Sequence, residues 1–202
     1  TSNITILLLI LITSISTASA KIRVVSTFSI LGDMVKNIGG DKIELTTLVG
    51  PNGDGHVYEP TPADAKSIAN ADLVFVNGLG FEGWIDRLVK ASGYKGKVII
   101  ATKGIKDLQF DGELDPHAWQ DLSNGRIYIK NIKNALTDVN PKNSDYYKKK
   151  FIAYDEILES MDKSTKDRFA GISKKNRKVI TSHDAFTLKD LVTFNKKHNF
   201  AN

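Results

Sequence analysis

The sequence contains no cysteine and only four histidines in 202 residues. Without cysteine no disulfide can form, so the fold depends on its hydrophobic core. Aromatic residues make up 8% of the chain and do not interleave with the densest basic groups, Lys148–Lys150 and residues 174–178. A nucleic-acid platform needs basic and aromatic side chains together. The net charge of +5 therefore indicates solvated helix faces and no nucleic-acid partner.

A long hydrophobic run is also missing, because the apolar stretch Ile4–Ile12 is too short to span a bilayer. It is followed by Ala18 and Ala20, which form an Ala-x-Ala pattern typical of signal-peptide cleavage. We predict that residues 1–20 are a signal peptide. Export without cysteine favours a bacterial periplasm, with the cell surface as the alternative. A buried helix is disfavoured because the stretch shows no amphipathic period.

From Lys21 on, strand-like and helix-like segments alternate at the spacing of right-handed βαβ units. This alternation predicts an α/β fold with a parallel sheet, and an N-terminal α/β lobe over residues 21–138. The predicted strands are Ile22–Phe28, Ile43–Val49, Asp72–Val76 and Lys97–Ala101. The predicted helices are Ile30–Ile38, one that opens at Thr61-Pro62, Glu82–Ala91 and Asn124–Asp138.

The pattern becomes more polar after the N-terminal lobe. Asn143–Phe169 reads as one long helix, which would span about 40 Å at 1.5 Å per residue. We predict that residues 139–172 connect two lobes, and that residues 173–202 begin a second α/β lobe. Its first strand is expected at Arg177–Thr181.

Three of the four histidines lie in short loop motifs: Gly55–Pro60 holds His56, Asp115–Trp119 holds His117, and Thr181–Phe186 holds His183. Two of these loops follow predicted strands, and ligands bind at the carboxyl ends of strands in open α/β sheets. Neutral imidazole is the commonest zinc ligand, and three of them leave one coordination position open. We therefore predict a metal site. The fourth histidine, His198, lies in a lysine-rich tail outside any motif and is expected to be exposed.

These segments resemble the periplasmic metal-binding proteins of zinc and manganese ABC importers. The resemblance lies in residues 50–64, Ala71–Val74 with Asn77–Leu79, Asp115–Trp119 and Ser182–Phe186. It implies two α/β lobes joined by one long helix, with the ion held between them by His56, His117 and His183. It also implies a monomeric receptor, not an enzyme, that delivers the ion to an ABC permease with its ATPase.

The expected cargo is Zn²⁺, with Mn²⁺ less favoured. Manganese-type members of the family tend to have glutamate where this chain has His183, and imidazole favours zinc whereas manganese prefers oxygen ligands. Because the ligands must be neutral imidazoles, affinity is expected to fall as the pH drops through the histidine range. A metal-scavenging adhesin, which would act in cell adhesion, is a variant of the same hypothesis.

The sequence departs from the family pattern in three places. The histidine- and acid-rich loop of some zinc members is missing, and Gln120–Leu122 stands where an Asp-Pro pair is common. After Phe186 the family pattern stops, so most of the second lobe and the aspartate that usually supplies the fourth ligand are not found. The expectation is a C-terminally truncated receptor with an incomplete second lobe. The alternative is a non-functional fragment or one half of a split receptor.

Two further alternatives concern the site. Glu59 and Asp184 either orient the imidazoles or are solvated charges, and Tyr58, Trp119 and Phe186 either form an apolar collar or are ordinary core aromatics. The enzyme rival is a zinc hydrolase, because three histidines and a water form a catalytic constellation. The sequence contains no His-Glu-x-x-His motif to support it.

Overall fold

The computed structural model describes residues 20–106, 109–110, 113–173 and 176. A parallel sheet of four strands in the order β2-β1-β3-β4 forms the centre of the molecule. The strands are β1 (Ile22–Phe28), β2 (Ile43–Val49), β3 (Leu73–Val76) and β4 (Lys97–Ile100). In the register of β1 with β2, Ile22 lies opposite Ile43 and Phe28 opposite Val49. The predicted α/β class is therefore confirmed.

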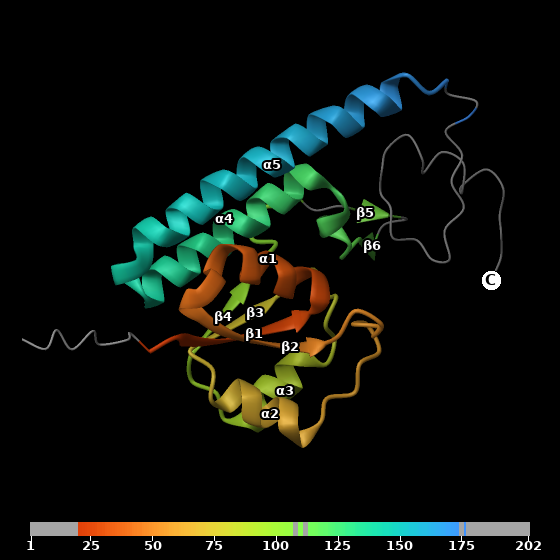
Figure 1. The fold of residues 1–202 in the computed structure, drawn as a ribbon. Helices are drawn as coiled ribbons and strands as arrows, with labels where there is room; N and C mark the ends of the chain where they lie inside the picture. The colour runs from red at the N-terminus through yellow and green to blue at the C-terminus, as the bar shows by residue number, and fades with distance from the viewer. Residues whose placement is uncertain (1–19, 107–108, 111–112, 174–175, 177–202) are drawn as a thin grey trace, which may run out of the picture.

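Helices cover both faces of the sheet (Figure 1). On one face lies α1 (Ser29–Gly39), on which α4 (Leu122–Val139) and α5 (Ser144–Ala170) pack. On the other face lie α2 (Pro62–Ala69) and α3 (Ile85–Ser92). Three 3₁₀ turns, η1 (Gly40–Lys42), η2 (Ala118–Gln120) and η3 (Pro141–Asn143), complete the helical elements of the described residues. None of these helices is long and apolar enough to cross a membrane.

The hydrophobic pattern explains the central strands. All four residues of β3 are buried, as a strand covered on both faces requires. The edge strand β4 is less covered, with Val98 40% and Ile100 50% exposed. The chain passes from β1 to β2 on one side and then to β3 on the other, so the strand order reverses between β1 and β3. In such sheets the ligand crevice lies at the carboxyl ends of the strands beside this switch point.

The helix boundaries follow from local chemistry. The α1 helix ends at Gly39, and Gly40 follows with a φ of +55°, where a side chain would collide with the Tyr146 hydroxyl. The α2 helix begins with a capping box in which Thr61 and Asp64 satisfy each other's backbone N–H groups. Both ends were predicted from the sequence.

Two predictions about the elements were wrong or incomplete. The helix expected from Glu82 begins at Ile85, because the Glu82 side chain instead accepts hydrogen bonds from the backbone of the preceding turn. A short antiparallel pair, β5 (Gln109–Phe110) and β6 (Glu113–Leu114), was not predicted.

The long helix is confirmed as α5, whose 27 residues are tied to α4 by Arg126, which contacts Asp155 at 2.7 and 2.9 Å. Its role as a connector between two lobes remains a prediction. The signal-peptide segment, the strand expected at residues 177–181, His183, Asp184, Phe186 and His198 lie outside the described residues.

Candidate metal centre

Two of the three motif histidines meet at one place. His56 lies in the loop between β2 and α2, and His117 directly precedes η2. Their Nε2 atoms are 3.1 Å apart and their ring centroids 5.2 Å apart. His56 is exposed, whereas His117 is only 7% exposed. His56 is thus the more accessible residue of the pair, and His117 the more enclosed one.

Asp115 fixes the ring of His117. Its Oδ1 accepts hydrogen bonds from the backbone N–H of His117 at 2.9 Å and from the ring Nδ1 at 2.7 Å, and its side chain is 3% exposed. Because a carboxylate can only accept, Nδ1 donates. In a neutral ring this leaves the Nε2 lone pair directed toward His56. A carboxylate that holds the distal N–H of an imidazole is the usual support of a metal-ligating histidine.

The loop of His56 repeats part of this arrangement. Oδ1 of Asp54 accepts from the backbone N–H of His56 at 2.9 Å, as Asp115 does for His117. Both histidines thus stand two residues after an aspartate whose side chain closes an Asx turn. The repeated Asp-x-His spacing is a sequence signal that would have identified Asp115, which we had not singled out.

Aromatic rings surround the imidazoles. The Phe81 ring lies 4.6 Å from that of His56, and the Trp119 ring 5.3 Å from that of His117, measured between centroids. Phe28, at the end of β1, packs against both Phe81 and Trp119. An apolar wall of this kind lowers the local dielectric and strengthens interactions with a bound charge. Trp119 therefore belongs to the apolar collar, which was one of the two alternatives for it. Phe28 and Phe81 also belong to the collar, and the sequence did not predict them.

Two other residues considered from the sequence do not contact the imidazoles. Tyr58 packs on Trp84 at 5.2 Å and donates its hydroxyl hydrogen to Asp64 at 2.9 Å, so it belongs to the core beside α2. Glu59 is exposed, which favours the solvated alternative. Among the described residues, Asp115 is a carboxylate that orients an imidazole, that of His117.

Glu82, in the turn between β3 and α3, is a buried acid that is 5% exposed. Its Oε1 accepts from the Thr27 hydroxyl and the Asn77 backbone N–H, each at 2.6 Å, and its Oε2 from the Gly78 N–H at 3.2 Å. Burial raises the pKa of Glu82 above its ordinary value more than these hydrogen bonds lower it. Glu82 thus joins β1 to the turn after β3.

The separation of the two imidazole nitrogens fits a hydrogen bond between the rings, and it also fits a shared ion. At the zinc–nitrogen distance of about 2.0–2.1 Å, a separation of 3.1 Å corresponds to an N–metal–N angle of about 100°. They line a hollow of about 540 Å³ that is open to the solvent, together with Phe28, Phe81 and Trp119. Among the described residues, no group of three His, Cys, Asp or Glu side chains could hold a metal ion. A third ligand of one of these four residue types would therefore come from outside the described residues.

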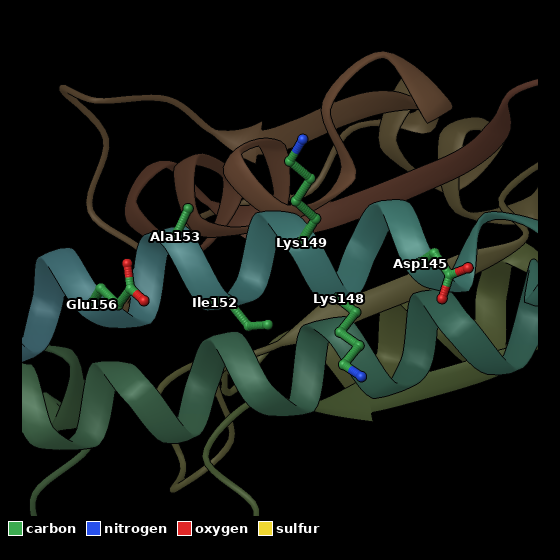
Figure 2. A pocket seen from close by; sticks show the side chains of 6 residues that line it. All are labelled: Asp145, Lys148, Lys149, Ile152, Ala153 and Glu156. Carbon is green, nitrogen blue, oxygen red and sulfur yellow. The ribbon is translucent and has the colours of Figure 1, made fainter.

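A second hollow, of about 330 Å³, lies on α5. Figure 2 shows its six side chains along one helix, with the amines of Lys148 and Lys149 pointing to opposite sides. They are Asp145, Lys148, Lys149, Ile152, Ala153 and Glu156. This mixed-charge helix surface contains no histidine, so the hollow at the two imidazoles is the better candidate for a functional site.

Comparison with known proteins decides the family. The family described as "Zinc-uptake complex component A periplasmic" matches residues 24–190. The chain belongs to this family. It is 41% identical over 185 residues to the manganese ABC transporter substrate-binding lipoprotein PsaA of Streptococcus pneumoniae, a match that covers 86% of this chain and 60% of the relative. It is 39% identical over 197 residues to the iron ABC transporter substrate-binding lipoprotein MtsA of Streptococcus pyogenes serotype M1, covering 91% of this chain and 64% of MtsA.

Solved structures agree. A manganese-bound mutant of a periplasmic metal-binding protein from Candidatus Liberibacter asiaticus superposes with a TM-score of 0.77 at 37% identity, covering 83% of this chain and 64% of that one. Zinc-bound AdcA from Streptococcus pneumoniae superposes with a TM-score of 0.75 at 27% identity, covering 83% of this chain and 36% of AdcA.

The family resemblance drawn from the sequence motifs is thus confirmed, and the relatives are named as transporter substrate-binding proteins, not enzymes. The chain spans about 60% of the length of PsaA. The names of the relatives include manganese and iron as well as zinc, so they do not single out zinc.

Proposed function

We propose that this chain captures a divalent transition-metal ion outside the cytoplasmic membrane and delivers it to an ABC permease with its ATPase. The 3.1 Å approach of the two imidazole Nε2 atoms is the observation that carries this proposal. The relatives support it, because they are named as substrate-binding lipoproteins of metal ABC transporters. The receptor acts in the periplasm or at the cell surface, as a monomer.

The two histidines suit different parts of the capture step. The exposed ring of His56 is where an incoming ion first meets the protein, and the anchored ring of His117 then holds it in the aromatic hollow. We assign the third ligand to His183, on the motif that follows α5 in the sequence. An ion bound by residues that precede α5 in the sequence and by one that follows it would also raise the free energy of unfolding by mass action.

We propose zinc as the preferred cargo over manganese. Imidazole nitrogen suits zinc, whereas manganese prefers carboxylate and carbonyl oxygen, and this ligand set is made of three imidazoles. The relatives are named for manganese and iron, so the affinities of this chain for zinc and for manganese are the quantities to compare.

Calorimetric titration of the purified chain with Zn²⁺ and with Mn²⁺ tests the proposal. We expect saturable 1:1 binding of zinc, about tenfold or more tighter than binding of manganese, because imidazole nitrogen favours zinc. The control is the variant with His56, His117 and His183 all changed to alanine, which is expected to bind neither ion. Tighter binding of manganese than of zinc would make manganese the preferred cargo. A parent chain that folds but binds neither ion would contradict the receptor function.

A further inference from the structure

The segment Asn77–Trp84 between β3 and α3, which we call the 77–84 turn, has an unusual backbone. Gly78, Leu79 and Gly80 follow one another with φ angles of 86°, 55° and 78°. Leu79 is the one non-glycine residue with a positive φ in the part of the chain that the structure describes. Positive φ is disfavoured for leucine, and such strain persists only where the surroundings hold it in place. Strained residues of this kind cluster at ligand sites.

At its first residue the turn contacts the loop of His117. Nδ2 of Asn77 donates to the carbonyl oxygen of Pro116, the residue directly before His117, at 2.9 Å. The Asn77 side chain is itself held, because its Oδ1 accepts from the Tyr128 hydroxyl and its backbone N–H donates to Glu82 at 2.6 Å. Asn77 is fully buried. A fixed amide therefore sets the position of the peptide that leads into His117.

At its last residue the turn contacts the loop of His56. Nε1 of Trp84 donates to the carbonyl oxygen of Gly55, the residue directly before His56, at 2.7 Å. The backbone of Gly55 also packs closely on the Phe81 ring, since a Cβ at this position would lie 2.6 Å from two ring atoms. Phe81 in turn contacts the imidazole of His56. Trp84 is 3% exposed, so this contact is shielded from water.

We infer that the 77–84 turn is the positioning element for both candidate ligands, with Asn77 fixing the His117 loop and Trp84 the His56 loop. Each acts on the carbonyl of the residue that precedes a histidine, so one rigid turn sets the spacing between the two imidazoles. This gives a role to the Asn77-Gly78-Leu79 motif, which no ligand assignment explains. The inference rests on the proposed function for its metal readout, but the positioning itself is a property of the metal-free protein.

The test is Trp84→Phe, which removes the N–H donor and keeps an aromatic ring against Tyr58. Its control is Tyr94→Phe, which also removes one aromatic side chain's hydrogen bond to a backbone carbonyl, that of Lys97, away from the site. Loss of one hydrogen bond is expected to raise the zinc dissociation constant about fivefold to tenfold in Trp84→Phe and to leave it unchanged in Tyr94→Phe. In the metal-free protein, the ring signals of His56 in ¹³C-edited NMR spectra should shift or broaden more than those of His117, whose ring contacts that of His56.

Gly55→Ala serves as a second variant, because the added Cβ would lie 2.6 Å from the Phe81 ring and so displaces the buried residue before His56 without removing a core side chain. It should move the same His56 signals even if Trp84→Phe does not fold. Unchanged His56 signals in the folded variants would overturn the positioning role, as would equal shifts of both histidines. A parent chain that binds no zinc would overturn the proposed function instead, and the metal-free spectra would still decide the positioning role.

Discussion

His117→Ala is expected to weaken zinc binding by about a hundredfold or more. Loss of a residue that merely supports a metal ligand typically costs about 10–100-fold in affinity, and loss of a ligand should reach the top of that range. His117 is the histidine held by the buried carboxylate of Asp115 and packed against the Trp119 ring, so its imidazole is fixed in position. Competition titration with a zinc-binding dye measures the change.

His198→Ala is the matched control, because it removes the one histidine that lies in no motif. It should bind zinc like the parent chain. If instead both single variants bound zinc equally well, the pair of His56 and His117 would not be the metal site, whatever their spacing.

Glu82→Ala is expected to lower the free energy of unfolding by about 3 kcal/mol. Three donors would lose their acceptor: the buried Thr27 hydroxyl, the buried N–H of Asn77 and the half-buried N–H of Gly78. Each unsatisfied buried group costs about 1–3 kcal/mol, and relief of the carboxylate's own desolvation offsets part of the sum. At about 2–4 °C per kcal/mol for a chain of this size, the melting temperature should fall by roughly 10 °C.

Glu59→Ala removes a carboxylate that is exposed, so its melting temperature should match that of the parent chain. A Glu82→Ala protein that melted at the parent temperature would show that the buried hydrogen bonds do not stabilise the turn.

The pH dependence has a definite sign. Because burial raises the pKa of Glu82 above the ordinary 4.5, the folded protein binds more protons than the unfolded chain from that pH up to the raised value. Stability therefore falls as the pH rises through this window. Glu82→Gln cannot titrate, so its unfolding free energy should lack this part of the slope in denaturation series across the window.

Much of the sheet could be predicted from residue pattern. The boundaries of β1 and β2 coincide with the predicted ones. The run of β1 ends where the helical pattern of α1 begins at Ser29, and that of β2 ends at the turn residues Gly50 and Pro51. The start of α3 was predicted too early because Glu82 has good helix propensity. In the structure its side chain accepts hydrogen bonds from Thr27 and Asn77, which only the folded sheet brings close to it. Tertiary contacts decided the local structure at that point.

The site shows the same division. The motifs identified His56 and His117, and the edge of the parallel sheet explained why distant loops meet there. The pattern of single residues did not reveal which aromatic ring would face which imidazole. Phe81 was therefore missed, and for Tyr58 the sequence left open the collar and the core, of which the structure shows the core. Orientation of a ring depends on the packing of neighbours from four separate segments, which no local signal encodes. His183 as the third ligand remains a prediction.

Zinc K-edge X-ray absorption on the zinc-loaded chain tests the central claim most directly, because it counts the atoms bound to the ion. We expect at least two imidazole nitrogens at about 2.0–2.1 Å, with the multiple-scattering pattern of histidine rings, and one fewer in His117→Ala. A first shell of oxygen alone, or a spectrum that does not change in His117→Ala, would contradict metal binding by the paired histidines.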